Sequence, residues 1–104
     1  MVILKLRIRT PEEWREFAPG DSVTDFVFVP TTDELTPQLP VIIEISSQFL
    51  ANKVLVRGTV QSWRPAQPRI RVRAGAKIDV APDEQPKLTL LQEAFSGKRT
   101  DSNR

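Results

Sequence analysis

The feature that most constrains this fold is a series of short strand-like stretches separated by turns. From Leu4 to Arg9 apolar and basic residues alternate, which places the aliphatic side chains on one face and is typical of a half-buried strand. Proline or glycine separates most of the later stretches, so the chain is built from short strands. We expect strands at residues 2–9, 25–29, 41–45 and 54–63 and, as one kinked strand, at residues 69–80.

Two helices accompany these strands. The first should begin at Thr10, an N-cap residue with Glu13 at the capping-box position. The second is indicated by an apolar stripe with a spacing of three to four residues, which runs from Leu88 to Phe95 and stops before Gly97. The chain order is therefore a strand, a short helix, several strands and a terminal helix.

Short strands joined by turns, with Gly58 as a bend, indicate a mainly β fold in the form of a small closed or nearly closed β-barrel. We expect residues 1–97 to form a single domain and residues 98–104, which contain no apolar side chain, to form a disordered tail. The unbroken apolar run at residues 26–29 indicates burial on both faces or a partner surface. Four large side chains are expected to be largely buried: Phe28, Ile43, Trp63 and Leu91.

The composition argues against an enzyme. The chain has no Cys, no His and no Tyr, which removes the thiolate nucleophile, the commonest general base and the commonest zinc ligand. We therefore expect no catalytic residue, no metal site and no cofactor. No apolar run approaches the roughly 20 residues that span a bilayer, and the first is interrupted by Lys5, so we expect no membrane insertion, no signal peptide and a cytoplasmic location.

Three stretches in a fixed order carry a resemblance to a known family. They are residues 21–29, residues 58–63 with the pattern Gly-x-Val-x-x-Trp, and residues 75–80, and a Leu-rich helix follows them. In this order and spacing the chain resembles a PilZ domain over most of residues 4–97. The resemblance implies a six-stranded antiparallel β-barrel, with a short N-terminal helix and a C-terminal helix, in the bacterial cytoplasm. Typical members bind the second messenger cyclic di-GMP.

The sequence departs from the family where the nucleotide is bound. Family members use Arg-x-x-x-Arg at or before the start of the barrel and [Asp/Asn]-x-Ser-x-x-Gly on an early strand. Asp21 matches the acidic position, but Val23 stands in place of Ser and Phe26 in place of Gly. Residues 69–73 contain the arginine spacing, but downstream of the second motif. The resemblance therefore implies a degenerate member that does not bind cyclic di-GMP in the usual way.

Charge is distributed unevenly along the chain. Residues 1–52 carry a net charge of −4 and residues 53–104 a net charge of +6. Arg69, Arg71 and Arg73 alternate with apolar residues, which places the three arginines on one face of the predicted strand. If this face adjoins the basic face of the first strand, the two faces form one positive plate. An acidic protein surface would suit such a plate, and a solvated face, a nucleic acid or a small anionic ligand are the alternatives. The predicted partner-binding residues are Arg7, Arg9, Arg69, Arg71 and Arg73.

The sequence thus predicts a non-enzymatic PilZ-like signalling adaptor. It would act through a protein partner with an acidic surface, in bacterial signalling, motility or cell polarity, without the usual cyclic di-GMP binding. One alternative is a noncanonical cyclic di-GMP receptor that uses the arginine-rich strand. The other is a small basic β-barrel that binds nucleic acid, which is not expected because such sheets usually interleave aromatic side chains and only Trp63 lies near these arginines.

Overall fold

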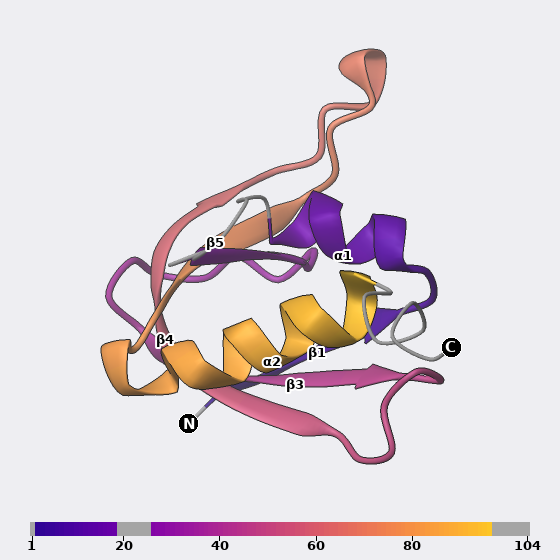
Figure 1. Ribbon diagram of the computed structural model, residues 1–104. Coiled ribbons are helices and arrows are strands. Elements are labelled where there is room, and N and C mark those ends of the chain that lie inside the picture. The colour runs from indigo at the N-terminus through magenta and orange to yellow at the C-terminus, as the bar shows by residue number, and fades with distance from the viewer. Residues whose placement is uncertain (1, 19–25, 97–104) are drawn as a thin grey trace.

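The computed structural model describes residues 2–18 and 26–96. These residues form one curled sheet of five strands, in the order β1-β3-β4-β5-β2, with two helices (Figure 1). The 3-10 turns η1 (Pro68–Ile70) and η2 (Pro82–Glu84) precede β5 and α2. The strands are β1 (Val2–Ile8), β2 (Phe26–Pro30), β3 (Pro40–Ser47), β4 (Val54–Arg64) and β5 (Gly75–Val80), and the helices are α1 (Pro11–Phe17) and α2 (Gln85–Ser96).

The mainly β class and both helices are as predicted, but the closed, six-stranded antiparallel barrel is wrong. The described residues contain five strands, and β1 and β2 are the two edges of a half-barrel that is not closed. In addition, β1 pairs with β3 in parallel, with Val2 opposite Val41 and Ile8 opposite Ser47. A parallel pair needs a crossover connection, and the segment that contains α1 and β2 forms this crossover.

The core lies between α2 and the concave side of the sheet (Figure 1). Leu88, Leu91 and Phe95 of α2 are buried, as the apolar stripe predicted, and Ile43 of β3 is fully buried. Trp14 of α1 packs on Phe95 with the ring centroids 5.4 Å apart. This contact attaches α1 to the terminal helix.

Two of the four residues predicted for the core are only half-buried. Trp63 packs against the core from the inner face of β4, and its Nε1 donates a hydrogen bond to the carbonyl oxygen of Thr31 at 3.1 Å. Phe28 lies on the outer face of β2, because Val27 and Val29 take the inner positions of this strand. Phe28 is therefore partly exposed on this face, although it also packs against the core.

The first helix begins as the sequence predicts. Thr10 Oγ1 accepts a hydrogen bond from the backbone N–H of Glu13 at 3.2 Å. The Glu13 carboxylate accepts from the N–H of Arg9 at 2.8 Å, one residue earlier than in a capping box. Among the described residues, no helix is long and apolar enough to cross a membrane. The helix stop at Gly97 and the tail at residues 98–104 lie outside the described residues.

A buried carboxylate holds the start of α2 against β4. Glu84 Oε1 accepts hydrogen bonds from the backbone N–H of Arg57 at 2.9 Å and from Lys87 Nζ at 3.0 Å. Lys87 Nζ also donates to the carbonyl oxygen of Leu55 at 2.7 Å, which ties the same helix to the same strand. The hydrogen bond from Arg57 is the main cause that lowers the pKa of Glu84, while burial acts in the opposite direction and Lys87 lowers it further.

One extra residue in β4 reverses which side chains face outward. The pairing with β5 shifts between Val60 and Ser62, so Gln61 is a β-bulge. Before the bulge the even-numbered residues of β4 face the core, and after it they face outward. The bulge therefore places Arg64 on the outer face, opposite Gly75.

The sequence placed a bend of this strand at Gly58, but the irregularity of β4 is the bulge at Gln61, three residues later. Gly58 lies in the regular part of β4, opposite Val80. A Cβ atom at this position would lie 2.6 Å from the carbonyl oxygen of Asp79, so glycine is needed here for the close approach of β5.

Candidate binding groove

The strands β4 and β5 continue beyond the sheet as a projecting hairpin (Figure 1). Gln67 and Val72 exchange two backbone hydrogen bonds of 2.8 and 3.0 Å, and η1 forms the tip. Arg71 closes the tip in the left-handed region, with a φ of 57°. Gln67 and Val72 pair in the same antiparallel register as Arg64 and Gly75 at the end of the sheet. The hairpin therefore directly extends β4 and β5.

The prediction of one kinked strand over residues 69–80 is wrong in its first half. β5 begins at Gly75, because η1 and the left-handed residue after it turn the chain at the tip. Arg69 and Arg71 are exposed at this tip, and Arg73 lies on the returning arm. The three arginines therefore do not share one strand face as the alternation suggested.

Phe28 forms a floor at the foot of the hairpin. Its ring covers Gly75 so closely that a Cβ atom on this glycine would overlap the ring. The guanidinium of Arg64 lies over the same ring, 4.6 Å from its centroid. The ring of Phe17 in α1 lies nearly parallel to the ring of Phe28, with the two centroids 6.4 Å apart. The guanidinium of Arg73 lies over the Phe17 ring, 5.6 Å from its centroid. Each arm of the hairpin thus places one arginine over an aromatic ring.

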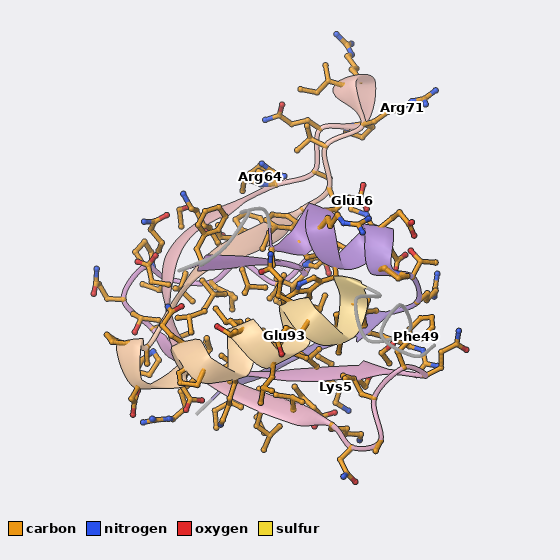
Figure 2. The ribbon with its side chains drawn as sticks, viewed as in Figure 1. Lys5, Glu16, Phe49, Arg64, Arg71 and Glu93 are labelled. Carbon is orange, nitrogen blue, oxygen red and sulfur yellow. The ribbon has the colours of Figure 1, made fainter. Side chains whose placement is uncertain are left out.

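A groove runs between α1 and the hairpin. Its central hollow has a volume of about 450 Å³, with Glu16 of α1 on one side and Arg64, Arg71 and Arg73 of the hairpin on the other. Figure 2 shows Arg71 at the tip of the hairpin and Arg64 at its foot, with Glu16 beside the foot. The Nε of Arg64 donates to the carbonyl oxygen of Arg73 at 3.3 Å, which further orients this side chain.

A second hollow, which we call the aromatic hollow, adjoins the central one. It has a volume of about 330 Å³ and shares Glu16, Phe28 and Arg64 with the central hollow. Phe26, Ser62, Gly75 and Lys77 also line it, and the Lys77 ammonium lies 4.3 Å from the centroid of the Phe26 ring. This end of the groove therefore offers two aromatic rings.

A third hollow, the basic hollow, adjoins the central one at its other end. It has a volume of about 160 Å³ and shares Phe17 and Arg73 with the central hollow. Its other cations come from β1 and the residue that follows it, and Pro30 of β2 also lines it, so the two edge strands approach each other here without pairing. These cations are Lys5, Arg7 and Arg9.

Among the described residues, cations outnumber carboxylates along the groove. Within residues 2–18 and 26–96, no cation of the groove lies within ion-pair distance of a carboxylate; the ion pairs of these residues involve other cations. In this part of the chain two carboxylates line the groove, those of Glu13 and Glu16, and Glu13 already accepts a backbone hydrogen bond. The cations that line the three hollows are Lys5, Arg7, Arg9, Arg64, Arg71, Arg73 and Lys77.

The structure brings together four of the five arginines singled out from the sequence. Arg7, Arg9 and Arg73 line the basic hollow, and Arg71 lines the central hollow. Arg69 lines none of the three hollows. The condition set for one positive surface, that the first strand lies near the arginine-rich segment, is met at Arg73, although this segment is a hairpin arm.

Sequence reasoning missed the part of the groove at the foot of the hairpin. Arg64 and Lys77 were not singled out, and neither Phe17 nor Phe28 was placed at a surface site. The unbroken apolar run at residues 26–29 was the available signal, because a partner surface was one of its two interpretations. In the structure its alternate side chains line the groove.

No family model matches the chain, and no curated protein matches its sequence. The chemistry of the groove is therefore the guide to its ligand. In the described part of the chain, no three or more acidic side chains are grouped so as to hold a metal ion.

Proposed function

We propose that the protein is a non-enzymatic, PilZ-like adaptor of the bacterial cytoplasm that holds an acidic segment of a protein partner in this groove. The observation that carries the proposal is the pair of arginines that lie over aromatic rings, Arg64 and Arg73, which have no carboxylate partner among the described residues. Arg64 donates its Nε–H to the carbonyl oxygen of Arg73, and a guanidinium over a ring still presents its terminal N–H groups to a carboxylate. Because stacking already restricts the side chain, binding costs less conformational entropy.

The remaining cations of the groove support an acidic partner. They extend the positive surface from the hairpin tip to β1 and attract carboxylates before contact is made. Arginine prevails over lysine among them, and arginine is the cation that pairs with carboxylates through two parallel hydrogen bonds. The adaptor role in bacterial signalling, motility or cell polarity follows from the PilZ resemblance.

The same resemblance supports the absence of the usual nucleotide site. Phe26 stands at the family's glycine position, and its ring lines the aromatic hollow beneath Lys77. A ring takes the place where a glycine would let the nucleotide approach the backbone. The neighbouring motif positions, Asp21 and Val23, lie outside the described residues.

Two other functions would use the same groove. A noncanonical cyclic di-GMP receptor is favoured by the stacked pair of Arg64 and Phe28, since a dianion with purine rings would meet both charge and an aromatic face. The volumes of the aromatic and central hollows also suit a small molecule. Nucleic-acid binding is favoured by the projecting hairpin, with Arg69 and Arg71 at its tip.

Reversing the charge of both stacked arginines tests the proposal. We expect a fluorescently labelled glutamate-rich peptide to bind the protein, more weakly as salt is added, and to bind the Arg64→Glu/Arg73→Glu variant at least about tenfold more weakly. Arg15→Glu/Lys53→Glu is the matched control, because it makes the same change in net charge at two exposed side chains outside the groove. Thermal melts establish that both variants are folded.

The outcomes separate the three functions. An equal loss of affinity in both variants would show that net charge alone binds the peptide and would overturn the groove. Calorimetry with cyclic di-GMP, and gel shifts with unrelated DNA and RNA, are carried out on the same proteins. A saturable isotherm for the nucleotide, or a shifted nucleic acid, with no peptide binding would assign the groove to that ligand instead.

A further inference from the structure

The two ends of the groove differ in their chemistry. At one end, the aromatic hollow is lined by the rings of Phe26 and Phe28 and by the exposed residue Ser62. Phe28 is only half-buried, so part of its ring is open to a ligand on the outer face of the sheet. An apolar ligand side chain at this end would bury aromatic surface that water now covers.

The opposite end offers charge and no open aromatic surface. The basic hollow is lined by Arg7, Arg9 and Arg73, and the ring it touches, Phe17, is buried. Its carboxylate, Glu13, is engaged by the backbone N–H that precedes α1. Ligand carboxylates are therefore stabilised most strongly at this end.

Glu16 makes the difference between the ends directional. Its carboxylate lines the aromatic and central hollows and does not line the basic hollow. Glu16 is exposed, and it makes no ion pair among the described residues. At the aromatic end a ligand carboxylate would meet Glu16 beside two cations, Arg64 and Lys77. At the basic end the carboxylate of Glu13 is outnumbered by four described cations, so an acidic ligand is favoured there.

We infer that the groove recognises an extended, composite segment of the partner. One apolar side chain of this segment lies in the aromatic hollow, and a cluster of Asp or Glu residues lies in the basic hollow. Glu16 enforces this order by disfavouring acids at the aromatic end. The inference rests on the proposed function, because it specifies the ligand of the same groove.

Three labelled peptides test the inference by fluorescence anisotropy. One carries a run of glutamates among glycine and serine, and the other two add a phenylalanine before or after the same run. We expect one of the two phenylalanine peptides to bind at least about tenfold more tightly than the acidic peptide. Phe28→Leu should remove this gain, measured as the ratio of the affinities for the phenylalanine and acidic peptides within the variant, because a weaker support for Arg64 would affect all three peptides alike. Glu16→Gln should raise the affinity for the acidic peptide, and so reduce the gain.

The result that overturns the inference is distinct from the one that overturns the proposed function. If all three peptides bind equally, or if Phe28→Leu leaves the gain intact, the composite ligand is wrong while the acidic groove stands. If none of the peptides binds the folded protein, the acidic groove itself is wrong. Glu16→Gln alters an exposed side chain, so it provides a test that does not depend on how a change at Phe28 affects folding.

Discussion

Replacing the buried carboxylate at the start of α2 should destabilise the whole molecule. Glu84 is only 5% exposed, and its Oε1 accepts hydrogen bonds from the Arg57 N–H and from Lys87 Nζ. In Glu84→Gln the side chain keeps its shape, and its amide oxygen can still face both of these donors. The amide NH₂ group then replaces Oε2, which faces Nη2 of Arg57 at 3.5 Å, and the charge that the donors complement is gone.

The expected loss of stability is about 2 kcal/mol. A hydrogen bond to a charged group contributes roughly 1.5–3 kcal/mol and one to a neutral group roughly 0.5–1.5 kcal/mol, and two bonds lose their charge here. The free energy of unfolding from urea titration at pH 7 measures the loss. For a domain with a total stability of roughly 5–15 kcal/mol, the shift in midpoint is readily detected.

The loss should also depend on pH in one direction. The pKa of Glu84 is lower in the folded protein than its usual value of 4.5, so folding is favoured by the ionised form. The stability that Glu84 supplies is therefore fully present above about pH 4.5 and decreases as the pH falls through the lower folded-state pKa. We expect the difference between the wild type and Glu84→Gln to be constant near neutral pH and to shrink in acid.

A neighbouring carboxylate provides the control for this prediction. Asp83 also pairs with Arg57, but its side chain is 68% exposed, so Asp83→Asn should unfold within error of the wild type. The reasoning is refuted if the two variants are equally stable at pH 7. It is also refuted if the cost of Glu84→Gln stays the same from neutral to acidic pH.

Two further substitutions test the floor of the groove. Phe28→Ala should lower the free energy of unfolding by about 1–2 kcal/mol, as measured by urea titration. This is below the roughly 3–5 kcal/mol lost at a fully buried phenylalanine, because Phe28 is half-buried. A loss in the higher range would place Phe28 in the core. Gly75→Ala should cost about 1–3 kcal/mol, because its Cβ would displace the Phe28 ring. In the Phe28→Ala background the same change at Gly75 should cost far less, and equal costs in both backgrounds would contradict the packing described here.

The features of the fold that depend on local chemistry were predictable from the sequence. The alternation in β1 and the apolar stripe of α2 each place their buried residues correctly. The N-cap at Thr10 forms the expected hydrogen bond with the N–H of Glu13. Each of these features depends on residues within about one turn or a few strand positions, so the printed order of residues contains the necessary information.

The features that the sequence did not predict depend on pairings between distant segments. The parallel pairing of β1 with β3 joins residues such as Leu6 and Ile45, and no local pattern distinguishes a parallel from an antiparallel neighbour. The segment at residues 69–72 has the alternation of a strand, yet Pro68 and the left-handed residue Arg71 make it a hairpin tip. Here turn chemistry prevailed over periodicity.

The sequence did not predict the groove for the same reason, because it is formed by contacts between distant segments. Its arginines differ from the others in lying over aromatic rings and not in their charge. The Gln61 bulge turns Arg64 outward, and the missing side chain at Gly75 leaves room for the Phe28 ring beneath it. Arginine alternation singled out Arg69 as readily as Arg73, although their surroundings differ. Arg73 lies over an aromatic ring beside a hollow, whereas Arg69 is exposed at the tip and lines none of the hollows of the groove.

An arginine at the hairpin tip adds long-range attraction that salt screens, and an arginine over a ring adds a preorganised contact. Two arginines of equal charge should therefore contribute unequally to the binding of a partner.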